Sequence, residues 1–159
     1  MKNLTISALT FIFILFSYVS LQAETGNDNK DESKINWVSV DEMQKLNKAE
    51  PRKVFFDVYT DWCTWCKRMD VATFQDQEIV EYVNNNYYAV KLDAESDKKV
   101  TFNNTTLTER ELARAFRVSG YPTVVLIDEK LTTIMPVPGF QKPDAFKKIL
   151  VQFNKENVQ

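Results

Sequence analysis

Histidine is absent from the 159-residue sequence, and cysteine occurs only twice. Without histidine, no imidazole is available to stabilise a cysteine thiolate, and one copy of the chain cannot complete a zinc site from cysteine and histidine ligands. Basic runs are also absent and the formal net charge is −2, so nothing in the composition indicates nucleic-acid binding. We therefore expect no metal, no other cofactor and no nucleic-acid partner.

The first 23 residues are typical of a secretory signal peptide. Lys2 precedes a mostly apolar stretch from Leu4 to Leu21, and Ala23 is followed by a polar segment. We expect cleavage near Ala23. An uncleaved membrane anchor is the alternative, because the stretch approaches the roughly 20 residues that a spanning helix needs. No cysteine lies near the cleavage site, which excludes a lipid anchor of the bacterial lipoprotein kind.

Three segments follow from this reading: a signal peptide at 1–23, a flexible leader at 24–34 and one domain at 35–159. The leader contains no large apolar side chain and cannot contribute to a core. The remaining residues are enough for one domain with a substantial core. Cleavage after Ala23 removes one charge, Lys2, and leaves 19 basic and 22 acidic residues, a net charge of −3.

Cys63 and Cys66 follow the apolar run 54–56 and precede a segment with a helical pattern. If Cys63 occupies the first position of that helix, its sulfur faces free backbone N–H groups and the positive end of the helix dipole, which favour the thiolate. Cys66, one turn later, is close enough to form a disulfide with Cys63. This arrangement favours redox chemistry in which Cys63 attacks and Cys66 resolves.

Two other uses of the cysteine pair remain open. Exported chains often use disulfides for stability, but a four-residue ring contributes only about 2 kcal/mol, against about 3 kcal/mol for a fifteen-residue ring. Two thiolates could also hold Cu(I), which would make the chain a metal carrier rather than an enzyme.

The hydrophobic pattern alternates between strand and helix periodicities along the domain. Strands are predicted at 35–38, 54–59, 87–93, 123–128 and 132–137, and helices at 39–49, 63–72, 77–84, 108–116 and 143–154. Residues 94–107 are predicted to be a long polar loop. The alternation implies parallel pairing through crossovers, and the last two strands form an antiparallel hairpin, so we expect an α/β fold with a mixed sheet covered on both faces.

Four separated segments resemble thioredoxin-fold thiol–disulfide oxidoreductases in order and spacing, over residues 35–155. They are Trp62-Cys63-Thr64-Trp65-Cys66-Lys67, which resembles the W-C-x-x-C-K active site, Phe56-Asp57-Val58, Val90-Lys91-Leu92-Asp93, and Val118-Ser119-Gly120-Tyr121-Pro122-Thr123, which resembles V-x-G-x-P-T. The resemblance implies a thioredoxin-like three-layer α/β/α sandwich. With Thr73-Phe74 behind it, the cysteine segment is similar to that of exported thioredoxin-like proteins of bacteria, which implies a periplasmic or other extracytoplasmic location.

The resemblance also implies roles for two charged residues. Asp57 corresponds to the family's buried aspartate, whose pKa burial should raise, so that it exchanges a proton with Cys66. Lys91 corresponds to the lysine that pairs with this aspartate and moderates the shift. An ordinary buried ion pair is the alternative for both residues.

Substrate contacts are expected around the cysteines. The resemblance implies a cis peptide bond at Pro122, in the segment Gly120-Tyr121-Pro122, which leaves the Tyr121 backbone free to pair with an extended substrate. Trp62 and Trp65 would offer flat apolar surface for docking. Packing of the two tryptophans against the helix end is the alternative.

We expect the chain to act on protein disulfides as a monomer, with a membrane-bound electron donor that resets the cysteine pair. The direction is predicted as reducing, because no histidine stabilises the Cys63 thiolate. A disulfide oxidase or isomerase is the alternative, although isomerases of the family usually dimerise through an added domain.

Overall fold

The computed structural model describes residues 33–156, so the predicted signal peptide and most of the predicted leader lie outside the described residues. The strands are β1 (Trp37–Val38), β2 (Lys53–Tyr59), β3 (Tyr87–Asp93), β4 (Lys99–Phe102), β5 (Thr105–Thr108), β6 (Thr123–Ile127) and β7 (Ile134–Pro138). The helices are α1 (Val40–Ala49), α2 (Thr64–Ala72), α3 (Gln77–Asn86), α4 (Glu109–Ala115) and α5 (Pro143–Glu156). Within the described residues, no helix is long and apolar enough to cross a membrane.

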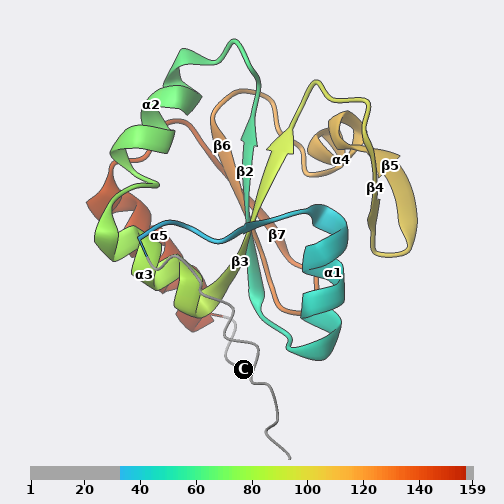
Figure 1. Cartoon of the computed structure of the whole chain (residues 1–159), viewed down its shortest axis with the longest axis horizontal. Helices are drawn as coiled ribbons and strands as arrows, with labels where there is room; N and C mark the ends of the chain where they lie inside the picture. The colour runs from blue at the N-terminus through green and yellow to red at the C-terminus, as the bar shows by residue number, and fades with distance from the viewer. Residues whose placement is uncertain (1–32, 157–159) are drawn as a thin grey trace, which may run out of the picture.

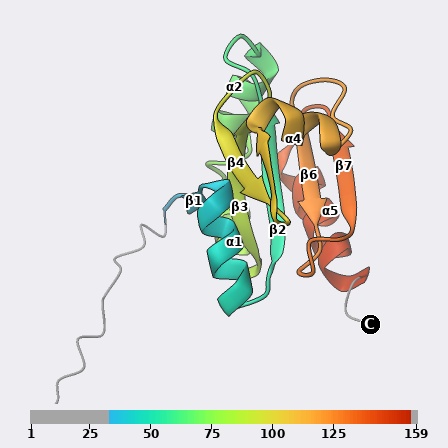
Figure 2. The ribbon, with the colours of Figure 1, turned by 90° about the vertical axis from the view of Figure 1, so that its right-hand side faces the viewer.

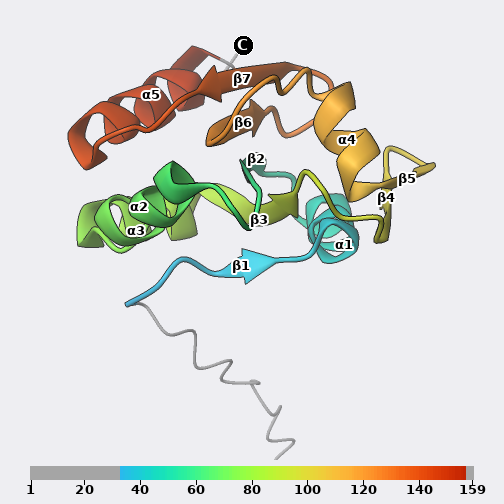
Figure 3. The same cartoon turned by 90° about the horizontal axis from the view of Figure 1, so that it is seen from above.

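The central sheet has five strands in the order β1-β3-β2-β6-β7. β1, β3 and β2 are parallel, whereas β6 pairs antiparallel with β2 and β7 pairs antiparallel with β6. Figure 3 shows the five strands side by side, with helices to either side of them. The predicted α/β class with a mixed sheet is therefore confirmed.

Both faces of the sheet are covered, which explains why β2 is apolar along nearly its whole length. α1 and α4 cover one face, and α2, α3 and α5 cover the other (Figure 1). Val54, Phe56 and Val58 belong to the core under α1 and α4, whereas Phe55 belongs to the core under α2, α3 and α5. Because side chains alternate along a strand, Asp57 shares the face of Phe55, which is the face that α2 covers.

The prediction of a polar loop over residues 94–107 is wrong. Residues 99–108 form an antiparallel hairpin, β4–β5, which lies beside α4 and α1 (Figure 2). Asn103 and Asn104 form its turn with positive φ angles of 48° and 64°, a conformation that asparagine tolerates better than most residues. Val100 and Phe102 point from β4 into the core, so the hairpin is a packed part of the domain.

Polar side chains cap the starts of two helices. Ser39 caps α1, and Thr108 and Glu111 form a complete capping box at α4, in which each side chain accepts a hydrogen bond from the other residue's backbone N–H. The predicted first strand is shorter than expected, because only Trp37 and Val38 pair with β3.

Candidate active site

Cys63 and Cys66 form a disulfide at the start of α2, with their Cα atoms 5.3 Å apart. Cys63 is the N-cap residue of α2, whereas the sequence predicted that it would occupy the first helical position. The backbone N–H of Cys66 donates a hydrogen bond to the Cys63 sulfur at 3.0 Å. The sulfur of Cys63 therefore occupies the place of a capping oxygen and accepts one of the free N–H groups of the first turn.

The two tryptophans beside the cysteines are exposed, although the sulfurs are not. Cys63 and Cys66 each expose 4% of their surface, whereas Trp62 exposes 65% and Trp65 exposes 53%. Both tryptophans therefore present apolar surface next to the disulfide, while one edge of each ring packs on a neighbouring ring, Tyr121 or Phe140.

Asp57 is almost fully buried in β2, and the register of the sheet pairs it with Lys91 of β3. The Lys91 ammonium donates to Asp57 Oδ2 at 2.8 Å. Asp57 Oδ1 is also buried and has no hydrogen-bond partner among the described residues. Burial raises the pKa of Asp57 to about 6, and the attraction of Lys91 offsets part of that rise.

Lys91 contacts a second carboxylate, that of Asp70 on α2. Its ammonium also lies over three aromatic rings, at 4.9 Å from the ring centre of Trp37, 5.3 Å from Tyr59 and 5.7 Å from Phe74. Burial alone would lower the pKa of Lys91, but attraction to Asp57 and then Asp70 outweighs burial and raises it. Lys91 is thus held as a cation between one buried and one partly exposed carboxylate.

Asp70 is the site residue that the sequence reasoning missed. It lies four residues after Cys66, so it projects from the same side of α2 one turn further on. That spacing is the only signal in the sequence, and many exposed helical carboxylates share it.

The segment 120–122 lies beside the cysteine segment. The Tyr121–Pro122 peptide bond is cis, and the rings of Tyr121 and Trp62 meet edge to face with their centres 5.9 Å apart. Gly139 N–H donates to the carbonyl of Pro122 at 2.8 Å. Within residues 33–156, the backbone N–H and carbonyl of Tyr121 make no hydrogen bond.

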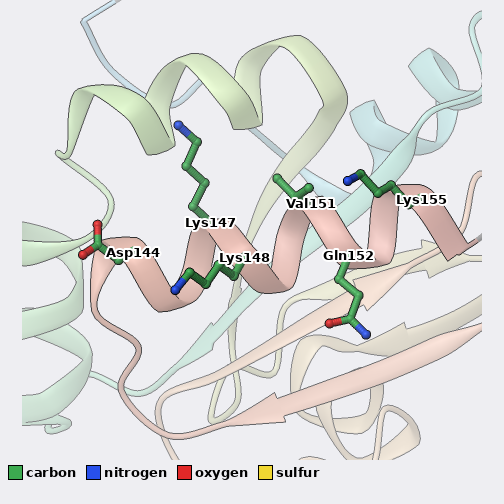
Figure 4. A pocket seen from close by; sticks show the side chains of 6 residues that line it. All are labelled: Asp144, Lys147, Lys148, Val151, Gln152 and Lys155. Atoms are coloured by element: carbon green, nitrogen blue, oxygen red, sulfur yellow. The ribbon is translucent and has the colours of Figure 1, made fainter.

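A pocket of about 860 Å³ lies along α5 (Figure 4), and neither cysteine is among its described lining residues. Its described lining comes from one helix: Asp144, Lys147, Lys148, Val151, Gln152 and Lys155. Lys147 extends toward α3 and donates to Glu78 at 2.5 Å. We assign no chemistry to this surface, because none of the site residues described above lines it.

Comparison with known proteins identifies one family. Residues 40–154 match the family described as a thioredoxin-like domain. The thiol:disulfide interchange protein DsbD of Actinobacillus pleuropneumoniae is 29% identical over 153 residues, which cover 91% of this chain and 25% of that protein. The chain therefore spans about a quarter of the length of this curated relative.

Solved structures agree on the fold. A thioredoxin from Thermus thermophilus aligns with a TM-score of 0.63 and 21% identity, covering 79% of this chain and 91% of that one. The C-terminal domain of DsbD from Neisseria meningitidis, in its oxidised form, aligns with a TM-score of 0.54 and 24% identity, covering 70% of this chain and 89% of that one.

Proposed function

This chain belongs to the thioredoxin-like domain family, and on that premise we propose that it is a thiol–disulfide oxidoreductase that reduces disulfides of extracytoplasmic proteins. The observation that carries the proposal is the Cys63–Cys66 disulfide at the start of α2, where the Cys66 N–H donates to the Cys63 sulfur. Once the disulfide is reduced, a backbone donor at this sulfur favours the thiolate, which is the nucleophile in thiol exchange.

The reducing cycle has two exchange steps. The Cys63 thiolate attacks one sulfur of a substrate disulfide, the substrate S–S bond breaks, and the other substrate sulfur leaves and takes up a proton. Cys66 then loses its proton and attacks the Cys63 sulfur, which releases the second substrate thiol and joins Cys63 to Cys66. Two electrons have passed to the substrate, together with the proton that left Cys66 and one proton from water, because Cys63 began as the thiolate. A membrane-bound electron donor must then reduce the pair.

Asp57 is the group we assign to the proton that leaves Cys66. It lies on the sheet face that α2 covers, and its Oδ1 has no hydrogen-bond partner among the described residues. With a pKa raised to about 6, the carboxylate is ionised at neutral pH yet basic enough to accept a proton. Lys91 would limit the rise of that pKa by its contact with Asp57 Oδ2.

The substrate is proposed to bind as an extended segment across the cysteine pair. The free N–H and carbonyl of Tyr121 can pair with a substrate backbone. Gly120 has no side chain to obstruct that approach, and nothing lies within 4 Å of where its Cβ would be. Trp62 and Trp65 supply apolar contact on the two sides, and Pro122 shapes the segment.

The location is proposed from residues 1–23, which lie outside the described residues. A signal peptide there would deliver the domain to an extracytoplasmic compartment, where thiol–disulfide exchange is a common use of paired cysteines. The N-terminus of the protein recovered from the producing cell, read by mass spectrometry, should begin near residue 24.

The activity is tested by insulin reduction with dithiothreitol as the electron source. Cys63→Ser should abolish the activity, because the thiolate that starts the exchange is lost. Cys66→Ser, reduced beforehand and mixed with insulin without dithiothreitol, should keep the first step and accumulate a mixed disulfide with substrate. Thr64→Ala, between the cysteines, should leave the activity nearly unchanged. Full activity of Cys63→Ser would disprove the proposal.

The direction is tested by equilibrating the Cys63–Cys66 pair against glutathione or a thioredoxin. A potential near the roughly −270 mV of thioredoxin supports a reductase. A potential near the roughly −120 mV of a strong oxidant would contradict the reducing direction and identify an oxidase.

A further inference from the structure

Arg68 forms a small surface cluster with Trp65 and Phe140 beside the cysteine pair. Its guanidinium carbon lies 5.0 Å from the ring centre of Trp65 and 5.6 Å from that of Phe140. The two ring centres are themselves 5.6 Å apart. We call these three residues the Arg68 shelf.

Within residues 33–156, the guanidinium of the shelf has no carboxylate partner. No described Asp or Glu lies within ion-pair distance of Arg68, although Arg110, near Trp62, pairs with Asp97 at 3.0 Å. Arg68 is exposed, and Lys67 beside it is exposed as well. The aromatic faces hold the guanidinium in place through cation–π contact, so less side-chain freedom is lost when an anion binds there.

The shelf adjoins the surface on which we place the substrate. Trp65 lies between the two cysteines in sequence, and Arg68 follows on the next turn of α2. Phe140 follows Gly139, whose N–H donates to the carbonyl of Pro122 at 2.8 Å. The Arg68 shelf therefore contains residues of α2 and a residue next to Gly139, which contacts the cis-proline segment.

The charge near Trp62, on the other side of the disulfide, is different. The Trp62 indole N–H donates to the carboxylate of Glu95 at 3.0 Å. A carboxylate is thus held against Trp62, whereas a guanidinium is held against Trp65. A substrate segment that contacts both tryptophans therefore meets the Glu95 carboxylate beside Trp62 and the Arg68 guanidinium beside Trp65.

We propose that Arg68 determines specificity by selecting disulfide partners that carry an acidic side chain close to the reacting cysteine, on the side that contacts Trp65. A carboxylate there meets a guanidinium that lies over two aromatic rings and pairs with no carboxylate of the described residues, and the rings of Trp65 and Phe140 exclude water from one side of the contact. This inference rests on the proposed exchange activity of Cys63 and Cys66.

The test uses short peptides that each carry a disulfide to a small thiol leaving group. A single Glu, Gln or Lys is placed at each flanking position in turn, and kcat/KM is measured with reduced protein. At one flanking position, Glu should be favoured over Gln by about two- to fivefold, the range expected of an exposed charge pair. The preference should decrease as salt is added.

Variants of Arg68 assign the preference to this residue. Arg68→Gln should remove the preference for the Glu peptide. Arg68→Glu should invert the preference, so that the Lys peptide reacts fastest. Arg68→Lys should keep part of the preference, because the charge remains without the planar head group. Lys148→Gln, an exposed cation on α5, is the matched control and should keep the full preference.

The neutral Gln peptide separates this inference from the proposed function. Its reaction reports the exchange activity alone, so the rate of each Arg68 variant with the Glu or Lys peptide is divided by its own rate with the Gln peptide. If the Gln peptide reacts normally but Arg68→Gln keeps the Glu preference, or wild type shows none, the role of Arg68 is disproved while the oxidoreductase stands. Failure of every peptide with wild type would overturn both.

Discussion

The carboxyl group of Asp57 is buried next to the apolar core and forms an ion pair with one lysine, Lys91. One of its oxygens bonds Lys91 and the other is buried without a partner among the described residues. Burial is therefore only partly compensated, which is why the pKa of Asp57 is raised while that of Lys91 is raised as well. At neutral pH this pair contributes less to stability than its short distance suggests.

Replacing Asp57 by Asn should stabilise the protein at neutral pH. In the folded protein the pKa of Asp57 is raised from 3.8 to about 6, so the fold binds this proton more tightly than the unfolded chain does. The resulting stabilisation is complete below about pH 4 and is lost as the pH rises through about 6. Relative to wild type, the free energy of unfolding of Asp57→Asn should therefore increase between pH 4 and pH 8, by up to about 3 kcal/mol.

Urea unfolding of the oxidised proteins at a series of pH values measures this difference. The exposed Asp61→Asn variant controls for the loss of one negative charge. A difference between Asp57→Asn and wild type that stays flat or decreases over this pH range would show that Asp57 has no raised pKa.

Asp70→Asn should lower the pKa of Asp57. The negative charge of Asp70 raises that pKa directly, and Asp70 also shares the Lys91 ammonium. Without it, Lys91 acts on Asp57 alone, so the carboxyl ionises at lower pH. Carbon NMR of the Asp57 carboxyl against pH measures the midpoint. Lys91→Met should raise the midpoint of Asp57. Equal midpoints in the two variants would refute this account of Asp57, Lys91 and Asp70.

The residue roles differ in how far the sequence could reveal them. Asp57 and Lys91 occupy strands with strong apolar patterns, and the family resemblance implied that they pair, as the parallel register of β2 and β3 places them. Asp70 needs the packing of α2 onto the sheet, which no local pattern encodes. The contact of Arg68 with two rings likewise depends on where the loop before α5 places Phe140.

At the scale of elements, the hairpin β4–β5 is the part of the fold that the sequence did not reveal. Its strands have four residues each; Val100 and Phe102 of β4 are buried in the core, and Leu107 of β5 packs partly against it. These strands contain too few apolar residues for a clear strand pattern, so their polar composition favoured the prediction of a loop. The pair Asn103-Asn104 was the available signal, because two residues with positive φ are typical of a tight hairpin turn.

Phe102→Ala should destabilise the protein without removing its activity. The Phe102 ring packs on Phe56 and Phe116 with ring centres 6.2 Å and 5.3 Å away, on the sheet face opposite Asp57. Loss of a buried phenylalanine costs about 3 to 5 kcal/mol. Thr101→Ala, on the exposed side of the same strand, should change the free energy of unfolding by less than about 0.5 kcal/mol.

Urea unfolding and insulin reduction, measured below the unfolding midpoint, test the two parts of this prediction. If Phe102→Ala is as stable as Thr101→Ala, the hairpin does not contribute to the core. If its folded form is inactive, the hairpin supports the site as well as the fold.

At the scale of the whole molecule, the sheet determines where the chemistry lies. β2 ends at the cysteine segment, β6 begins at the cis-proline segment, and their antiparallel pairing brings Val58 opposite Thr123. The strand order therefore joins two segments about sixty residues apart into one site. This level was the most predictable, because alternating strands and helices permit few arrangements of a sheet covered on both faces.

The oxidised protein should be more stable than the reduced protein. By restricting the unfolded chain, a four-residue ring stabilises the folded protein by only about 2 kcal/mol, so the effect of the cross-link itself is small. A strongly oxidising member of this fold class reverses the order because its folded state stabilises the reduced thiolate. This chain has no histidine that could stabilise a Cys63 thiolate. In the described structure, the stabilising contact at the Cys63 sulfur is the hydrogen bond from the Cys66 N–H.

Thermal or urea unfolding of the two forms, with and without a dithiol reductant, measures the difference directly. The Cys63→Ser/Cys66→Ser double variant should match the reduced form, because neither can form the cross-link. By thermodynamic linkage, a reduced form more stable than the oxidised form would mean that folding favours reduction of the pair. The protein would then act as an oxidant, and electrons would flow from its substrates to Cys63 and Cys66.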